Sequence, residues 1–150
     1  MYLGAYATLR MYDNAKINGN TASTSANTSA QGGGVYMTNS TFTMNGGEIS
    51  GNTATTQRVA LGGGVSIRLD SQFIVASEAI KLNIKNNTLS GGGNTNTATV
   101  YGAQVYKGGS TEGVIGGQSF GGYSVFTVGN GAGSYVEQDA GTAKGYDSWN

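Results

Sequence analysis

The sequence predicts an all-β fold: a single-stranded parallel β-helix, or solenoid, of about four coils with short strands and Gly/Asn corners. The first observation behind this prediction is an internal repeat, because the segment from Gln31 to Ala54 is restated from Leu61 onward, about thirty residues later. Self-similarity at a period of roughly 20–50 residues is the signature of stacked repeats. The second observation is composition, with 27 glycines and no proline in 150 residues. Proline cannot donate to a strand ladder, so its absence suits a chain whose backbone N–H groups are all needed for pairing.

Three patterns recur and define the repeat units. The pattern Ile-x-x-Asn-Thr begins at Ile17, Ile49 and Ile84. A short strand, led by glycine in its first two copies, recurs at 34–36, 64–66 and 104–106. An alternating strand recurs at 9–11, 42–44 and 73–75. These alignments predict β-helix repeats over 1–107, with units near 7–40, 41–70 and 71–107 and three very short strands in each unit.

Each predicted strand is too short to be stable alone. Period-2 alternation places Phe42 and Met44 on one face of a strand and Thr43 on the other. A few buried side chains at about 1.5–3 kcal/mol each do not offset the ordering of a whole unit at about 1 kcal/mol or more per residue. Hydrogen bonds and packing between neighbouring units must therefore supply the remaining stability.

The corners are predicted from Gly and Asn. Glycine adopts the positive φ angles of tight corners, and asparagine tolerates them better than most residues. Asn20, Asn52 and Asn87 occupy the same place in the Ile-x-x-Asn-Thr pattern. We expect them to form a structural corner ladder, since stacked asparagine amides bond to one another along a column.

The stretch GGGVYMTNSTFTMNGGEISGNTA, from Gly32 to Ala54, resembles the Gly-rich repeats of bacterial surface proteins with a right-handed parallel β-helix, broadly the autotransporter-passenger and adhesin type. The resemblance covers roughly residues 7–107. It implies right-handed coiling and an extracellular or cell-surface location, with a targeting signal outside this chain. That fold also carries polysaccharide lyases and ice-binding proteins, so the resemblance is more specific to architecture than to function.

The segments between the predicted strands are expected to project from one corner as loops. They are 22–30, 55–60 and 90–99, and insertions of this kind often emerge on the binding side of a solenoid. Residues 77–85 are interpreted as strand and corner in preference to a single helical turn. The remainder, 108–150, is Gly/Tyr-rich and is expected to supply a last strand at 125–128, a cap or a loosely ordered tail, with 146–149 as an anchor.

Composition argues against several functions. Formal net charge is zero, charged residues make up 11% of the chain, and histidine and cysteine are absent. We therefore expect no nucleic-acid partner and no direct membrane insertion. A cysteine protease, a histidine-based triad and a zinc site are excluded. No catalytic residue, metal ligand or cofactor is predicted, because Glu48 and Asp70 lie in adjacent units at non-equivalent places and are expected to be solvated.

Two sets of side chains are candidates for surface binding. Outward hydroxyls form the first set, which comprises Thr38, Thr41, Thr43 and Ser66. Aromatic rings of the second half form the other, chiefly Tyr106 and Tyr123. Such hydroxyls and rings suit sugars or ice. The alternatives are solvent-facing strand residues of good β propensity and tyrosines buried in a cap.

The leading functional prediction is a non-enzymatic extracellular structural protein, a β-helical stalk or adhesin segment. Its partners would be further copies of itself or surface glycans. Because the repeats start within about ten residues of Met1, an open coil end is expected to favour end-to-end association into oligomers or filaments. Two alternatives stay open: a carbohydrate-acting β-helix enzyme, and a glycan- or ice-binding β-helix.

Overall fold

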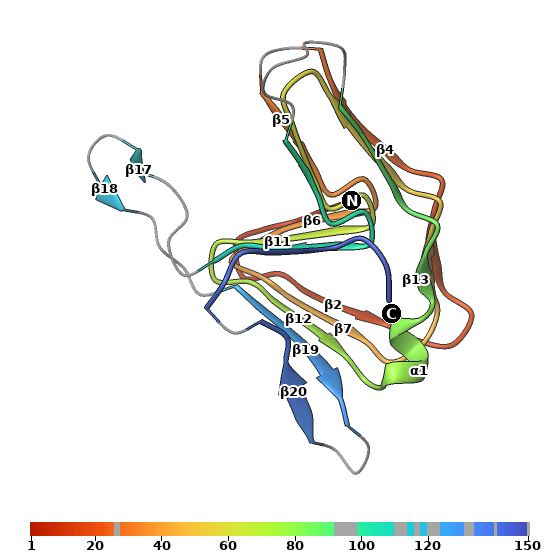
Figure 1. The fold of residues 1–150 in the computed structure, drawn as a ribbon. Helices are drawn as coiled ribbons and strands as arrows, with labels where there is room; N and C mark the ends of the chain where they lie inside the picture. The colour runs from red at the N-terminus through yellow and green to blue at the C-terminus, as the bar shows by residue number, and fades with distance from the viewer. Residues whose placement is uncertain are drawn as a thin grey trace.

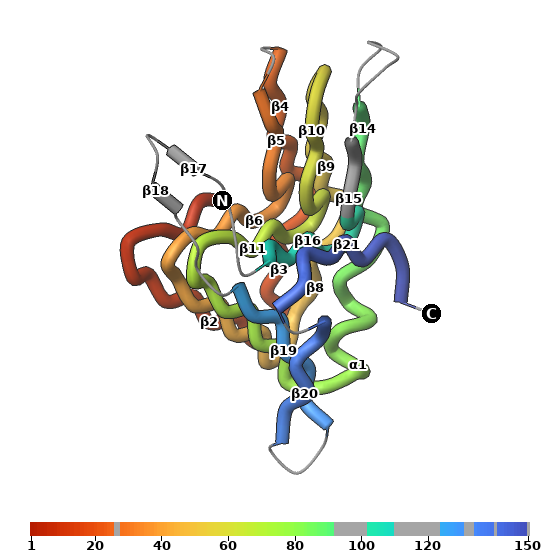
Figure 2. The backbone as a smooth tube through the Cα atoms, turned by 60° about the vertical axis from the view of Figure 1, so that its left-hand side comes forward, coloured from red at the N-terminus to blue at the C-terminus, as the bar shows by residue number. Residues whose placement is uncertain are grey.

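The computed structural model describes residues 1–25, 28–91, 99–109, 114–115, 118–119, 124–130, 134–139 and 141–149. The predicted all-β class is confirmed, because the described chain consists of short strands stacked in parallel into sheets, with a single one-turn helix. Successive repeats lie side by side, from the red first repeat on the left of Figure 2 to the green third repeat on the right.

Three sheets surround the main core (Figure 1). The first sheet contains β1 (Tyr2–Leu3), β6 (Val35–Thr38), β11 (Val65–Arg68), β16 (Val105–Lys107) and β21 (Lys144–Tyr146). The second contains β2 (Thr8–Met11), β7 (Thr41–Met44), β12 (Gln72–Val75), β19 (Val125–Gly129) and β20 (Tyr135–Glu137). The third contains β3 (Lys16–Asn18), β8 (Glu48–Ser50) and β13 (Ile84–Lys85). Within each sheet the repeats pair in parallel, and only β20 and β21 pair antiparallel.

Two further sheets form a projection that we call the arm (Figure 1). One contains β4 (Thr21–Thr24), β9 (Thr53–Thr56) and β14 (Thr88–Gly91); the other contains β5 (Ser29–Gln31), β10 (Val59–Leu61) and β15 (Thr99–Tyr101). Figure 2 shows them rising from the stack as three neighbouring hairpin-like segments. Elsewhere, β17 (Val114–Ile115) and β18 (Gln118–Ser119) pair antiparallel.

The pairing registers match the alignments drawn from the sequence. Ile17, Ile49 and Ile84 face one another in adjacent strands of the third sheet. In the second sheet the corresponding set, here called the phenylalanine column, is Leu9, Phe42, Phe73 and Phe126. The strand predicted at 125–128 is confirmed as β19. One-residue slips would turn the apolar side chains outward, so the alternating pattern determines the register.

The phenylalanine column runs through the centre of the core. Ring centroids lie 4.8 Å apart between Phe42 and Phe73 and 5.5 Å apart between Phe73 and Phe126, and both pairs are stacked. All three rings are fully buried. The stacked rings therefore stabilise the core in two ways, by removing apolar area from water and by aromatic contact between neighbouring repeats.

The expectation of three strands per unit is wrong, because the six strands of the arm overlap the segments predicted as loops, 22–30, 55–60 and 90–99. Their alternating small residues pair from repeat to repeat, with Ala54 between Ala22 and Leu89 and Ala60 opposite Ala30. Ala30, Ala54 and Ala60 form a second small core, with Leu89 packed against it. Alanine allows the two sheets of the arm to approach closely. Because alanine is only weakly apolar, its alternation with polar residues does not predict a strand from the sequence.

The interpretation of 77–85 as strand and corner is wrong at α1 (Glu78–Lys81). Ser77 caps this turn, with its Oγ accepting a hydrogen bond of 3.2 Å from the Ile80 backbone N–H. Glu78 lies in the first turn and forms an ion pair with Lys81 in the last. N-terminal acid and C-terminal base both complement the dipole of a helix.

The repeated glycine triplets lie where the arm leaves the main stack. Gly32 and Gly62 adopt φ of +63° and +66°, which other residues rarely do. A Cβ at Gly33 or Gly63 would collide with backbone carbonyl oxygens, those of Thr53 and Thr88 among them. The triplet therefore provides a corner and then a close approach between backbone segments of neighbouring strands.

The C-terminal segment covers one end of the stack. Trp149 donates a hydrogen bond of 2.6 Å from Nε1 to the Ile84 carbonyl, and its ring packs near those of Phe126 and Tyr146. Burial and a hydrogen bond to Asp139 raise the pKa of the Tyr146 hydroxyl above its ordinary value. The part of the predicted cap or tail that follows β19 thus contains two strands, β20 and β21, and a tryptophan against the core.

Candidate binding site at a corner of the stack

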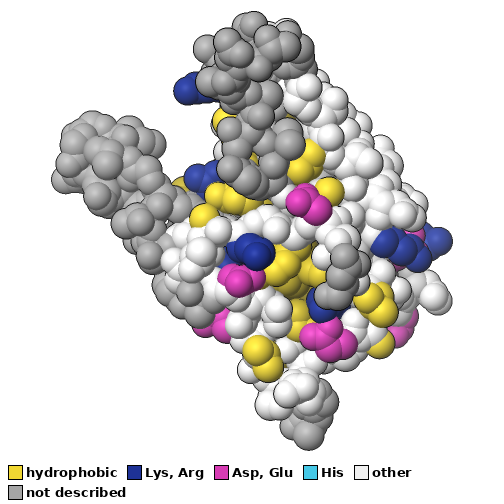
Figure 3. Space-filling view, in the orientation of Figure 1, with side chains coloured by type: hydrophobic (Ala, Val, Ile, Leu, Met, Phe, Trp, Pro, Cys, Tyr) yellow, Lys and Arg dark blue, Asp and Glu magenta, His cyan; other side chains and the backbone are white. Residues whose placement is uncertain are grey.

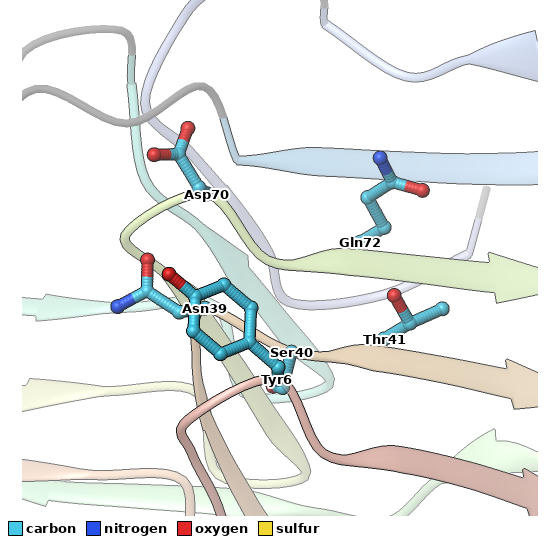
Figure 4. Close-up of a pocket in the computed structure, with 6 residues that line it drawn as sticks. All are labelled: Tyr6, Asn39, Ser40, Thr41, Asp70 and Gln72. Atoms are coloured by element: carbon cyan, nitrogen blue, oxygen red, sulfur yellow. The ribbon is translucent and has the colours of Figure 1, made fainter.

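An open pocket lies at the corner between the first and second sheets (Figure 4). We call it the Tyr6 pocket, and it is lined by Tyr6, Asn39, Ser40, Thr41, Asp70 and Gln72. Its volume of about 270 Å³ lies just below the range for small-ligand sites, roughly 300–1,000 Å³. The pocket therefore suits a small ligand or one unit of a longer one.

Backbone conformation sets the corner in each repeat. Tyr6, Asn39 and Asp70 have positive φ angles of 67°, 46° and 55°. The Tyr6 N–H donates to the Asn39 carbonyl at 2.7 Å, and the Asn39 N–H donates to the Leu69 carbonyl at 2.6 Å. Asparagine and aspartate tolerate this left-handed conformation, whereas tyrosine is strained in it. Successive repeats thus place a phenol, an amide and a carboxylate at equivalent corners.

The rest of the pocket is polar and well ordered by the strands. Ser40 is buried, and its hydroxyl donates to the Leu3 carbonyl at 3.3 Å. Thr41 and Gln72 face each other in the register of β7 and β12. The Tyr6 side chain is 91% exposed, and Figure 4 shows it beside Asn39, with Asp70 farther along the same corner.

An exposed aromatic ring beside amide, hydroxyl and carboxylate groups is suited to a neutral sugar. The ring supplies an apolar face, and the polar groups bond to hydroxyls. Among the residues that line the pocket, all of them described, Asp70 is the single carboxylate. Glycoside hydrolysis ordinarily needs two carboxylates that flank the scissile bond.

The predicted hydroxyl set is not one surface. Thr41 lines the Tyr6 pocket and Thr43 is half-buried on β7. The prediction that Thr38 and Ser66 face outward is wrong, because both residues are buried, with 8% and 0% exposure. The hydroxyl of Thr38 lies 3.0 Å from that of Tyr2, and Ser66 lies between Tyr36 and Tyr106 in register. Larger neighbours therefore cover both.

A regular hydroxyl array does exist, on a different sheet. We call it the hydroxyl face, and it consists of Thr21, Ser23, Thr53, Thr55, Thr88 and Ser90. Alternate residues of β4, β9 and β14 point into the arm, so these point outward. Thr53 and Thr88 hydroxyls lie 2.9 Å apart. The repeated Thr-x-Ser/Thr triplet was the available signal in the sequence.

Of the two predicted tyrosines, Tyr106 is half-buried, with the Arg68 guanidinium 5.8 Å from its ring centroid. Tyr123 lies outside the described residues. Tyr6 was not among the candidates, although it lies just before the first predicted strand, at 9–11.

The asparagine column comprises Asn20, Asn52, Asn87 and Gln104. Asn52 Oδ1 accepts from the backbone N–H and Nδ2 of Asn20 at 3.0 and 2.9 Å. Asn87 Oδ1 accepts from the same two groups of Asn52, both at 3.0 Å. Gln104 Oε1 continues the pattern toward Asn87 at 3.3 and 2.9 Å. Sequence alignment supplied the three asparagines and missed Gln104, which differs in type.

The acidic side chains do not meet at one place. Glu48 lies beside a separate pocket, whereas Asp70 lines the Tyr6 pocket. The Ser50 hydroxyl and the Lys85 ammonium, 3.0 Å away, hold the pKa of the Glu48 carboxylate below its ordinary value. No group of three or more acidic, cysteine or histidine side chains within the described ranges is arranged to hold a metal. Figure 3 shows charges of both signs dispersed over one face.

The chain matches no protein-family model, no curated protein and no solved structure. In the part of the chain that the structure describes, no helix has the length and apolar character needed to cross a bilayer.

Proposed function

We propose that the chain is a right-handed parallel β-helix that serves as a non-enzymatic scaffold, a stalk or adhesin segment of an extracellular or cell-surface bacterial protein. The observation that carries this proposal is the matching of side chains through the stack. Phenylalanines pack on phenylalanines, and asparagine amides bond to asparagine amides, from one repeat to the next. Such repetition yields a stiff body.

In such a scaffold, ligand recognition is assigned to the residues that differ between repeats. At one equivalent corner the three repeats present Tyr6, Asn39 and Asp70, and together these form much of the Tyr6 pocket. We assign the pocket to a neutral glycan, bound by stacking on the Tyr6 ring and by hydrogen bonds to the amides and the carboxylate.

We expect neutral oligosaccharides to bind, and Tyr6→Ala to weaken binding at least about tenfold, because a stacking ring and the pocket wall are lost. Isothermal titration calorimetry on ligands chosen from a glycan array measures this. Tyr12→Ala is the matched control, since Tyr12 is also exposed, at 53%, and does not line the pocket.

Two outcomes would contradict this assignment. An array without any bound glycan removes the pocket as a sugar site. Release of new reducing ends from a bound polysaccharide, lost in Asp70→Asn, would support the carbohydrate-acting enzyme instead.

A second candidate function, ice binding, is favoured by the hydroxyl face. Its strands lie about 4.8 Å apart and its residues recur about every 6.7 Å along each strand, which makes a flat, periodic array of hydroxyls on three strands. A periodic array can order a layer of water that merges with a crystal surface.

We expect wild-type protein to show thermal hysteresis if this second function holds, and Thr55→Lys to abolish it by breaking the flat array. Thr43→Lys, on the second sheet, should leave it unchanged. A freezing point equal to the melting point for wild-type protein would rule the function out.

A further inference from the structure

We propose that the outer face of the first sheet contains a binding slot for a small hydroxylated aromatic carboxylate. We call it the Ser66 slot, and it consists of Tyr36, Ser66, Arg68 and Tyr106. It is a second site beyond the proposed glycan pocket, because the two share no lining residue. The inference follows from a gap in a row of tyrosines and from a buried hydroxyl that lies in this gap.

The gap lies in a row of side chains that crosses the first sheet. In register from strand to strand, its members are Tyr2, Tyr36, Ser66 and Tyr106. Alternation along the strand turns this row away from the core, since Val65, the neighbour of Ser66 on β11, is buried in the core. The row is therefore a ladder of phenol rings in which a serine replaces one ring.

The gap has the width that one flat ring needs. Neighbouring strands lie about 4.8 Å apart, so the strands of Tyr36 and Tyr106, on either side of Ser66, are about 9.6 Å apart. Stacked aromatic rings prefer centroid separations of about 4.5–7 Å, and Tyr2 stacks on Tyr36 in this row at 5.7 Å. A planar ring above Ser66 would therefore stack on both tyrosines at once.

The floor of the slot is a polar group without a partner. Ser66 is fully buried, and its Oγ has no hydrogen-bond partner among the described residues. An unpaired buried hydroxyl is costly, so a ligand hydroxyl that bonds to it gains binding energy. Tyr36 and Tyr106 are only half-buried, and surface side chains change rotamer on the picosecond to nanosecond timescale. Rotation of these two rings opens the way to Ser66.

Tyr2 shows how a ring in this row points along the sheet. Its hydroxyl lies 3.0 Å from the Thr38 hydroxyl, one outward position farther along the strands. On β11 the place of Thr38 is taken by Arg68. A ring above Ser66 that points the same way presents its end group to the Arg68 guanidinium. A carboxylate is the group that a guanidinium binds best, through two parallel hydrogen bonds.

The Arg68 guanidinium is already held beside the gap. Its Nη1 donates to Gln31 Oε1 at 2.8 Å, and its central carbon lies 5.8 Å from the centre of the Tyr106 ring. Because these contacts order the side chain in advance, binding loses little further entropy there. A ring for the tyrosines, a hydroxyl on the ring edge for Ser66 and a carboxylate for Arg68 together define the ligand class.

Nuclear magnetic resonance titration of the labelled full chain with 3-hydroxybenzoate tests the slot. We expect shifted amide signals in β6, β11 and β16, and tighter binding than benzoate, which has no hydroxyl for Ser66. Ser66→Ala should weaken 3-hydroxybenzoate binding about threefold to tenfold, the worth of one hydrogen bond. The same variant should leave benzoate binding unchanged, whereas a merely structural role of Ser66 would weaken both ligands equally.

Arg68→Gln tests the carboxylate contact. It should weaken 3-hydroxybenzoate binding at least about tenfold and leave binding of the neutral 3-hydroxybenzyl alcohol unchanged. Arg58→Gln is the matched control, because Arg58 is an exposed arginine between β9 and β10 and lies outside the slot. Ser66→Tyr completes the row of rings and should abolish binding by filling the slot, while circular dichroism verifies that the variant is folded.

Three outcomes would each overturn the proposal. They are a wild-type protein that does not bind 3-hydroxybenzoate, equal losses for 3-hydroxybenzoate and benzoate in Ser66→Ala, and equal effects of Arg68→Gln and Arg58→Gln. Binding of neutral glycans by Ser66→Tyr protein tests the proposed function separately, because Ser66 does not line the Tyr6 pocket.

Discussion

Phe73→Ala is expected to lower the free energy of unfolding by about 3–5 kcal/mol, the usual cost of truncating a buried phenylalanine. Phe73 is fully buried and stacks on Phe42 and Phe126, so truncation leaves a cavity and breaks two ring contacts at once. Since small domains are stable by only about 5–15 kcal/mol, the variant would lose a large part of its stability. Urea denaturation followed by circular dichroism measures the loss.

The same column provides the control. Leu9 faces Phe42 in the first repeat and is only partly buried, so Leu9→Ala should cost less, about 1–2 kcal/mol. Equal losses for Phe73→Ala and Leu9→Ala would show that the column does not lie at the centre of the core.

Asn52→Ala is expected to cost about 2–4 kcal/mol, because it leaves buried polar groups without partners at about 1–3 kcal/mol each. The Asn52 side chain accepts two hydrogen bonds from Asn20 and donates to the carbonyl of Ile17 at 2.8 Å and to Asn87 Oδ1. It is fully buried, so water cannot replace these bonds. Chemical denaturation of purified protein reports the change.

Asn20→Ala is the matched variant at the exposed end of the asparagine column. Its amide already contacts water, so the expected loss is below about 1 kcal/mol. If both alanine variants lost the same stability, burial of the column would not be the source of its strength.

Much of the main stack is predictable because chemically similar residues recur at equivalent places. Ile17, Ile49 and Ile84 align in the sequence and pair in the sheet. The arm is not predictable in this way, since its inward residues are mainly alanines, among them Ala30, Ala54 and Ala60. Their alternation with polar residues is a weak signal of a buried face, although threonine itself has good β propensity.

The Tyr6 pocket escapes prediction for the opposite reason. Its corner residues differ in type from repeat to repeat, so an alignment that searches for sameness passes over Tyr6, Asn39 and Asp70. What they share is a left-handed backbone after the strand of the first sheet, and glycine, asparagine and aspartate are only weak markers of that conformation.

The alanine core of the arm has a consequence for how such a chain can change in length. Because its strands alternate between inward alanines and outward hydroxyls, these strands can be lengthened only by two residues at a time if the alternation is to be kept. A single residue added within one strand would turn threonine inward beside Ala54. Other changes in length fall in the connections, which already differ, with four residues between β4 and β5 and two between β9 and β10. Natural or engineered variants of this chain should therefore differ in the length of each arm strand by an even number of residues, while the three sheets around the main core keep their spacing.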